Sequence, residues 1–301
     1  MDIQAGRRAT TLAELGAVMG QLMAPDEPGR SIASYRPRPT DVVITPFGKC
    51  GTTWLQQTFH TLRTRGDMDF DDISRVVPWI ETAASLGIDL DAEQRAAPRG
   101  FKSHLPFEMI PPGAKAVVSF RDPKDAMVSL YRFFEGWFFE PGTIGIHEFA
   151  VSRLNGPPGA PDYWGHLLSW WNQRDNPGVL IFSYEQMVSD PEGSIRRLAA
   201  FCDIPLDDDL LALALEQSSI DFMLKHKDRY DDAMMRALSE ARCGLPPGSD
   251  SAKVRKGVVG GHVKELPPET AALLDARWAE TVLPATGFAD YAALEAALRA
   301  R

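Results

Sequence analysis

The sequence predicts a single α/β domain, built on a central and mainly parallel β-sheet with helices on its flanks. Four short runs of β-branched and other apolar residues have the composition of strands that are buried on both faces. Segments with helical spacing of apolar residues alternate with these runs, which is the order typical of a parallel α/β sheet. The expected strands are 42–44, 100–105, 116–120 and 179–182.

Leucine and methionine recur at helical spacing over Thr11–Met23. Further helices are expected at 54–59, 92–97, 125–134, 191–202, 210–215, 220–223 and 268–282. Pro25–Pro39 is rich in proline and arginine, which favours an extended lead-in to the first strand. We therefore predict one domain, 1–301, in which 1–36 holds an N-terminal helix and the extended lead-in, and 228–264 forms a mobile, mostly polar loop.

Composition and charge argue against several classes of protein. Of the 301 residues, 44% are hydrophobic and 24% are charged, as in an ordinary soluble globular protein. The net charge of −9 argues against a general nucleic-acid-binding protein, which is usually basic. Cys50, Cys202 and Cys243 form no close pair and no metal-ligand spacing, which favours a reducing compartment. The first residues lack an apolar stretch long enough for a signal peptide or a transmembrane segment, so we expect a cytoplasmic protein.

The segment from Asp41 to Leu55, DVVITPFGKCGTTWL, has the features of a phosphate-binding loop. An apolar strand is followed by a loop with a lysine, a glycine and two threonines, and then by a helix. The free N–H groups and the dipole at such a helix start attract an anion, and Lys49 adds a full positive charge. Because Lys49 precedes Gly51, the spacing is not that of a Walker A motif, and a kinase or nucleoside triphosphatase fits poorly.

The string FGKCGTTW resembles the YPKSGTTW loop of the cytosolic-type sulfotransferases, which use 3′-phosphoadenosine-5′-phosphosulfate (PAPS). It departs from that loop at Phe47, Gly48 and Cys50, where the family usually has tyrosine, proline and serine. The resemblance implies a P-loop-NTPase-like sulfotransferase fold, with PAPS as co-substrate and no metal. It also implies that Lys49 contacts the bridging oxygen and the sulfonate, and that Trp54 faces the adenine. The residues that it assigns to this part of PAPS are Lys49, Cys50, Gly51, Thr52, Thr53 and Trp54.

Two further segments resemble the parts of this family that bind the 3′ phosphate. SFRDPKDAMVS is similar to the family's RNPKDVAVS, which implies that Arg121 and Ser129 clamp the phosphate, with Asp122 in place of asparagine. Arginine suits this role because its planar fork donates two parallel hydrogen bonds. VRKG resembles the family's RKG element, although Gly260-Gly261-His262 replaces the Gly-Asp-Trp run that usually follows. These matches also assign Arg255, Lys256, Gly257, Tyr184 (an adenine contact in the family) and Ser218 (a threonine in the family).

The segment Lys102-Ser103-His104-Leu105-Pro106 holds the candidate general base. Strand alternation would place residues 102 and 104 on one face, and histidine titrates near neutral pH, as base catalysis requires. KSHLP resembles the family's KTHLP, which implies that His104 takes the acceptor's proton while Lys102 helps the leaving group. The other histidines form no ligand pattern, so we expect no metal site; they are residues 60, 147, 166, 226 and 262.

Aromatic residues near these motifs are candidates for an apolar acceptor pocket. VPWIE resembles the family's VPFLE, and FFEGWFFE follows the phosphate clamp. Aromatic runs are usually core, but this one is aromatic on all faces and could also line a pocket or form a lid. In a pocket, Trp79 and Trp137 would lie beside His104. The candidates are Phe47, Trp79, Phe107, Phe134 and Trp137.

The resemblance covers about Arg36 to Lys264 and implies a PAPS-dependent sulfotransferase. The reaction expected is in-line transfer of sulfonate to a hydroxyl or amine of a small, largely apolar or lipid-like acceptor. One alternative is a catalytically inactive protein that binds adenosine 3′,5′-bisphosphate (PAP), and another is a kinase-like phosphotransferase. The sequence leaves the acceptor and the oligomeric state open.

Overall fold

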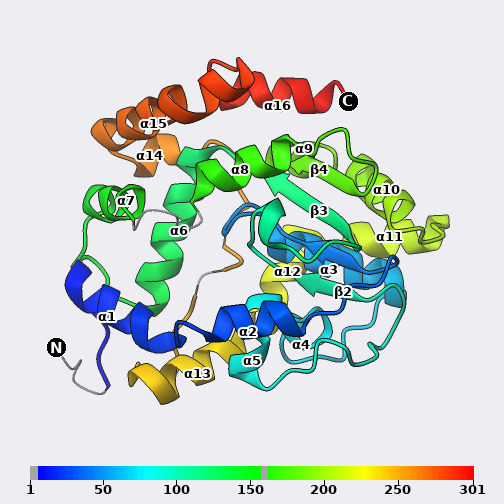
Figure 1. The fold of residues 1–301 in the computed structure, drawn as a ribbon, viewed down its shortest axis with the longest axis horizontal. Helices are drawn as coiled ribbons and strands as arrows, with labels where there is room; N and C mark the ends of the chain where they lie inside the picture. The colour runs from blue at the N-terminus through cyan, green and yellow to red at the C-terminus, as the bar shows by residue number, and fades with distance from the viewer. Residues whose placement is uncertain (1–5, 157–161, 252, 256) are drawn as a thin grey trace.

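A parallel sheet of four strands organises the fold (Figure 1). The computed structural model describes residues 6–156, 162–251, 253–255 and 257–301. Within those ranges the spatial order of the strands is β2-β1-β3-β4. The strands are β1 (Val42–Ile44), β2 (Gly100–Lys102), β3 (Lys115–Phe120) and β4 (Val179–Ser183). The predicted α/β domain with a mainly parallel central sheet is confirmed.

The register of the sheet brings three strand ends to one edge. Ile44 at the end of β1 lies opposite Lys102 of β2 and Val117 of β3. Gly100 begins β2 without a side chain, because a Cβ there would lie 2.2 Å from Cε1 of the Phe59 ring. The segments that leave β1, β2 and β3 therefore meet at the carboxyl edge of the sheet, where ligands bind in open α/β folds.

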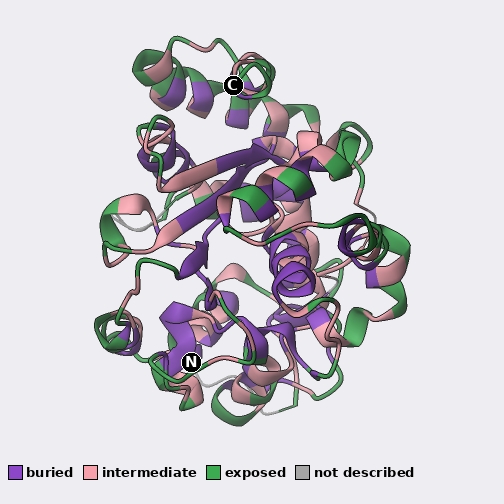
Figure 2. Ribbon diagram, turned by 90° about the vertical axis from the view of Figure 1, so that its right-hand side faces the viewer, coloured by how far each residue is buried: buried purple, intermediate pink, exposed green. Residues whose placement is uncertain are grey.

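Helices cover both faces of the sheet. One face packs against α3 (Thr52–Thr64), α10 (Pro191–Phe201) and α11 (Asp208–Gln217). The opposite face packs against α6 (Pro123–Trp137), α8 (Tyr163–Trp171) and α15 (Pro268–Thr286). Along β3, Val117 contributes to the first layer and Val118 to the second, which is why this strand is a continuous apolar run and appears buried in Figure 2.

Further helices and single helical turns complete the described part of the chain. The helices of more than one turn are α1 (Leu12–Leu22), α7 (Ile146–Leu154), α9 (Tyr184–Ser189), α12 (Ile220–Lys225) and α16 (Tyr291–Arg299). Single turns are α4 (Ile73–Val76), α5 (Ala83–Leu86), α14 (His262–Glu265), η1 (Ile80–Thr82), η2 (Phe107–Met109) and η3 (Lys227–Tyr230). No described helix is long and apolar enough to span a membrane.

The expected extended lead-in at Pro25–Pro39 is wrong in its first half, which forms α2 (Glu27–Ser34). Proline is tolerated in the first turn of a helix, and Glu27 accepts a hydrogen bond from the Ala24 N–H and pairs with Arg242 at 2.6 Å. The short helix expected at 92–97 is also wrong. There the side chain of Gln94 bonds to both the N–H and the carbonyl of Gly100, which favours an irregular backbone.

The prediction of a mobile loop over 228–264 fails for its central part, which forms α13 (Ala233–Cys243). Met235, Ser239 and Cys243 recur every four residues and are buried. This stripe packs near α1, at the lower left of Figure 1. Because polar residues stand between these positions, the composition of the segment does not indicate a helix with one buried face.

Candidate active site

The loop between β1 and α3 is held in a left-handed shape. Lys49 has a φ of 71° and Gly51 a φ of 104°, and a residue with a Cβ adopts such angles only where its surroundings enforce them. Nη1 of Arg121 donates to the Lys49 carbonyl at 3.0 Å. The Ser119 hydroxyl donates to the Cys50 carbonyl at 2.5 Å. Strand β3 and the residue that follows it therefore fix the predicted phosphate loop.

Buried donors at the start of α3 lack partners. The first N–H groups of any α-helix have no partner within the helix, and they form the positive end of its dipole. Thr52 Oγ1 and Arg121 Nε are buried and have no hydrogen-bond partner among the described residues. A buried polar group without a partner costs about 1–3 kcal/mol. The loop and Arg121 therefore fit an anion that would satisfy these donors.

Lys102 extends from the end of β2 into an ion cluster. Its Nζ lies 3.8 Å from the centroid of the Trp79 ring and 3.6 Å from Oδ1 of Asp232. Lys253 bonds the same Asp232 oxygen at 2.5 Å. Burial lowers the pKa of Lys102 to about 8, although Asp232 opposes this shift. Burial acts to raise the pKa of Asp232, but Lys102 and Lys253 hold it well below its usual value.

Lys49 belongs to the same electrostatic neighbourhood. Its Nζ lies 4.6 Å from the centroid of the Phe133 ring. Burial, followed by the charge of Lys253, lowers the pKa of Lys49 to about 7, while Asp232 acts in the opposite direction. Arg121 and Lys102 depress it further. Positive charge thus exceeds negative charge at the mouth of the loop, which favours an anionic ligand.

His104 follows β2 and is held in a defined orientation. Its Nδ1 lies 2.7 Å from the Pro46 carbonyl oxygen, and its backbone N–H donates to Glu81 at 2.7 Å. A carbonyl oxygen only accepts, so Nδ1 must carry the proton and Nε2 is left with a free lone pair. Burial and then Lys102 lower the pKa of His104 to about 3. Trp79 contacts both His104, at 5.2 Å between ring centroids, and Lys102.

Arg121 joins the loop to the segment near the C-terminus. Its guanidinium lies 4.1 Å from the centroid of the Tyr184 ring, and Nη2 donates to the Val258 carbonyl at 3.3 Å. Asp125 of α6 accepts hydrogen bonds from the Gly260 N–H at 2.7 Å and from the His262 N–H at 2.9 Å. These bonds hold residues 258–262 against the site, at the position where the sequence departs from the Gly-Asp-Trp run.

The other residues predicted to contact the nucleotide differ in how far they are buried. Ser129 is half-buried on α6, and Ser218 is buried at the end of α11. Gly257 has a φ of 61° and lies against Ile220, beside the start of α12. Arg255 pairs with Glu265 at 3.4 Å, and Trp54 is partly buried on α3. Lys256 lies outside the described residues, so its predicted role has no structural counterpart here.

Two of the aromatic residues predicted for the acceptor pocket are core residues instead. Phe134 and Trp137 are 4% and 3% exposed, and Trp137 donates from its indole to Ser239. Phe133, the neighbour of Phe134 on α6, is the ring that contacts Lys49. Consecutive helical residues differ by about 100° in direction, and this difference decides which ring reaches the site. We therefore remove Phe134 and Trp137 from the candidate pocket.

Two further aromatic candidates, Phe47 and Phe107, pack against residues of α8. Phe47 contacts Tyr163 and His166 through ring edges, each at 5.7 Å between centroids. Phe107 contacts Trp170 at 5.4 Å, and its N–H donates to Ser169, so it is tied to α8.

Two residues of this site were not predicted from the sequence, Lys253 and Asp232. Lys253 and Asp232 belong to a region expected to be a mobile loop, and neither forms part of a recognised motif. Phe133 belongs to the aromatic cluster FFEGWFFE that was predicted as a candidate pocket lining.

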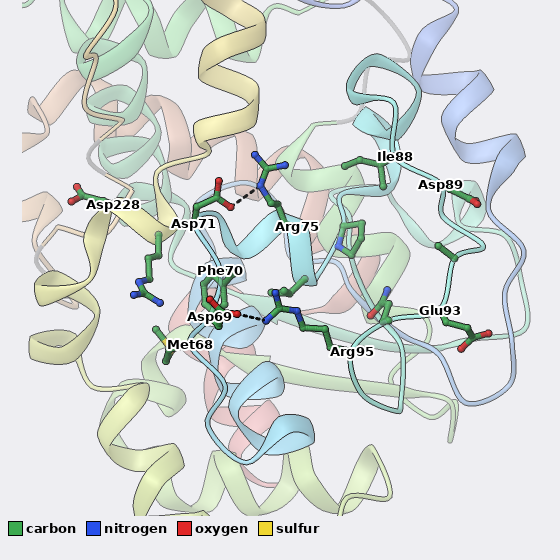
Figure 3. A pocket seen from close by; sticks show the side chains of 15 residues that line it. Met68, Asp69, Phe70, Asp71, Arg75, Ile88, Asp89, Glu93, Arg95 and Asp228 are labelled. Atoms are coloured by element: carbon green, nitrogen blue, oxygen red, sulfur yellow. Dashed lines mark hydrogen bonds and ion pairs between the residues drawn. The ribbon is translucent and has the colours of Figure 1, made fainter.

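A surface cavity of about 950 Å³ lies elsewhere (Figure 3). Its wall carries Asp71 paired with Arg75 at 2.6 Å, and Asp69 near Arg95 at 3.6 Å. None of the residues assigned to the anion site lines this cavity. Two of its arginines, Arg75 and Arg95, already face acidic residues of the wall, so it offers no comparable attraction for an anion.

The chain is similar to known sulfotransferases over most of its length. Residues 39–283 match the family model of the sulfotransferase domain. The chain is 26% identical over 265 residues to rat sulfotransferase 1C2, covering 84% of this chain and 86% of that protein. It is 28% identical over 245 residues to mouse sulfotransferase 1B1, covering 76% and 78%.

Solved structures share the fold. The complex of retinol dehydratase with retinol and PAP superimposes with a TM-score of 0.70 at 18% identity, covering 94% of this chain and 98% of that chain. Mouse sulfotransferase SULT7A1 in complex with PAP gives a TM-score of 0.64 at 23% identity, covering 87% and 91%.

Proposed function

This chain belongs to the family of PAPS-dependent sulfotransferases, and we propose that residues 47–53, Lys102 and His104 transfer the sulfonate of PAPS to a small acceptor. One observation carries the assignment. Arg121 and Lys102 act electrostatically on Lys49 near the carboxyl edge of the parallel sheet, and Thr52 Oγ1 and Arg121 Nε are buried there without partners. A phosphosulfate is an anion of suitable charge for this cluster.

The nucleotide would lie along the carboxyl edge of the sheet. The loop 49–53 would hold the 5′ phosphosulfate, with the Thr52 hydroxyl gaining the partner it lacks in the protein alone. Arg121 would bind the 3′ phosphate through Nε, supported by Ser129 and by Arg255 to Gly257. The contact of Tyr184 with Arg121 supports an adenine site next to this clamp, with Trp54 on its other side.

The chemistry requires a base, a nucleophile and a stabilised leaving group. Nε2 of His104 takes the proton from the acceptor hydroxyl or amine, whose lone pair forms the new bond to sulfur. The sulfur–oxygen bond to the 5′ phosphate breaks, and its electron pair remains on the phosphate oxygen of PAP. Lys49 stabilises that oxygen, and Lys102 assists, as cations do at a developing oxyanion.

The acceptor would approach His104 from the side of Trp79. Contact of the Trp79 ring with both His104 and Lys102 supports an aromatic wall beside the base. Phe47 and Phe107 remain the other aromatic candidates for this wall, which would suit a small, largely apolar acceptor with a hydroxyl or amine.

Calorimetric titration with PAP tests the assignment. We expect wild-type protein to bind PAP, the Arg121→Ala variant to bind at least about tenfold more weakly, and ATP with magnesium to bind weakly, because a lost charged hydrogen bond costs about 1.5–3 kcal/mol. Arg196→Ala, on the exposed face of α10, is the control for loss of one arginine. No binding of PAP would refute the proposal. Binding without transfer to any acceptor would favour the inactive alternative, and tight magnesium-dependent ATP binding the kinase-like one.

The affinity for PAP should fall as the pH rises above about 7. The pKa of Lys49 is lowered to about 7 and that of Lys102 to about 8, so the free protein loses these charges between pH 7 and 9. The anion binds the protonated form of each lysine. Above its pKa, a lysine must therefore take up a proton when PAP binds, and this lowers the affinity for PAP by up to about tenfold per pH unit for each lysine. Titrations from pH 6.5 to 9 measure this slope, and a flat profile would contradict it.

A further inference from the structure

Lys253 places a third lysine side chain at the transfer site, outside every motif recognised in the sequence. Its Nζ bonds Oδ1 of Asp232 at 2.5 Å, and its side chain is only 9% exposed. Lys102 approaches the same oxygen at 3.6 Å. Because the two ammonium groups share one carboxylate oxygen, they lie side by side.

The structure holds Lys253 in this place through adjacent residues. Asp231 accepts a hydrogen bond from the Ser251 N–H at 3.0 Å and also bonds the Ser251 hydroxyl. Asp232 has a φ of 49° and precedes α13 without a side-chain capping bond to it, so its carboxylate is not used by that helix. Asp231 therefore holds Ser251, and Asp232 holds Lys253.

Lys253 also lies close to the groups that carry the proposed chemistry. Among the charged groups that depress the pKa of Lys49, Lys253 has the largest effect. It also depresses the pKa of His104, after Lys102. The Lys253 ammonium group therefore lies within electrostatic range of both the proposed base and the lysine at the leaving oxygen.

Two buried ammonium groups share one bonded carboxylate in this space. Asp232 bonds Lys253 and Lys102, whereas Asp72 and Glu81 act on Lys102 with smaller effects. Each ammonium group has three donors, so Lys102 and Lys253 both keep donors for a second anion after their contact with Asp232. We propose that Lys253 contacts the sulfonate of PAPS and that Asp232 positions Lys253 and Lys102 for this contact. This inference rests on the proposed function.

The contact predicts a difference between two ligands. PAP and PAPS share the adenosine and the 3′ phosphate, but only PAPS carries the sulfonate. A lysine that binds the bisphosphate would affect both ligands, whereas a lysine that binds the sulfonate affects PAPS alone. The ratio of the two affinities therefore reports the position of Lys253 without requiring an acceptor or turnover.

Calorimetric titrations of the Lys253→Met variant with PAPS and with PAP, without acceptor, test the inference. We expect PAPS to bind about tenfold more weakly and PAP to change less than about threefold, as for loss of one charged hydrogen bond to the sulfonate. Lys253→Arg should restore most of the PAPS affinity, since it keeps the charge. Lys225→Met removes an exposed lysine from α12 and is the control for net charge. Asp232→Asn should also weaken the binding of PAPS more than the binding of PAP, because Lys253 and Lys102 lose the carboxylate that positions them.

Each other outcome overturns the inference. Equal weakening of both ligands would place Lys253 at the bisphosphate or show that it only supports the fold, which urea unfolding of the variant would detect. Unchanged affinities for both PAPS and PAP would mean that Lys253 bonds Asp232 and contacts neither ligand. If wild-type protein bound neither nucleotide, the proposed function would fail, and this inference with it.

Discussion

Replacement of Lys49 by methionine should lower turnover by about 100- to 1000-fold while the protein stays folded. The Lys49 ammonium is the group proposed to stabilise the oxygen on which charge develops as the sulfur–oxygen bond breaks. Methionine has nearly the same length and keeps the contact with the Phe133 ring. The loop should keep its shape, because Arg121 bonds the backbone carbonyl of residue 49 and not its side chain.

The stability of the Lys49→Met variant should equal or exceed that of wild-type protein. Folding lowers the pKa of Lys49 to about 7, so the folded state disfavours the charged lysine, and this cost is fully present below pH 7. Methionine removes the cost. The left-handed φ of 71° is strained for lysine and methionine alike, whereas glycine would relieve that strain. Lys49→Gly would therefore change backbone strain as well as charge and is not a suitable variant.

Initial rates of PAP formation, with any acceptor that the wild type uses, measure the loss. Urea unfolding monitors stability, and Lys49→Arg serves as the variant that keeps a positive charge. A Lys49→Met rate within tenfold of wild type would show that another group stabilises the leaving oxygen.

The sheet could be predicted because its strands carry their own signal. A strand buried on both faces is a continuous apolar run, and β1 and β3 are such runs. Helix α2 carries no comparable signal. It depends on the ion pair between Glu27 and Arg242, which are far apart in the sequence, so its stability arises from tertiary contacts.

The same distinction between local signals and tertiary contacts applies to the candidate site. The loop 47–53 is contiguous, and its lysine, glycine and threonines together indicate anion binding from the amino-acid sequence alone. Asp232 and Lys253 meet only because α13 folds between them, and neither sequence neighbourhood is distinctive. The KSHLP segment predicts Lys102 as a helper of the leaving group, but its contact with Asp232 joins residues that are far apart in the chain and leaves no local signal.

Substitution of His104 by asparagine should reduce turnover by about 100- to 10,000-fold and leave PAP affinity nearly unchanged. The asparagine side chain places an amide N–H where Nδ1 stands, so it can still donate to the Pro46 carbonyl. It offers no basic atom in the position of Nε2. The variant therefore separates the orientation of residue 104 from its proposed role as a base.

The low pKa of His104 in the nucleotide-free protein is consistent with this role. Burial and the charge of Lys102 lower it to about 3, so His104 is neutral and ready to accept a proton at any physiological pH. An anion bound among the lysines offsets the charge of Lys102 and raises the pKa of His104 towards the range in which a general base works well. Rates of PAP formation and calorimetric PAP titrations on the same His104→Asn preparation test the prediction. A turnover within tenfold of wild type would exclude His104 as the base, whereas a matching loss of PAP affinity would show that the residue supports the phosphate loop instead.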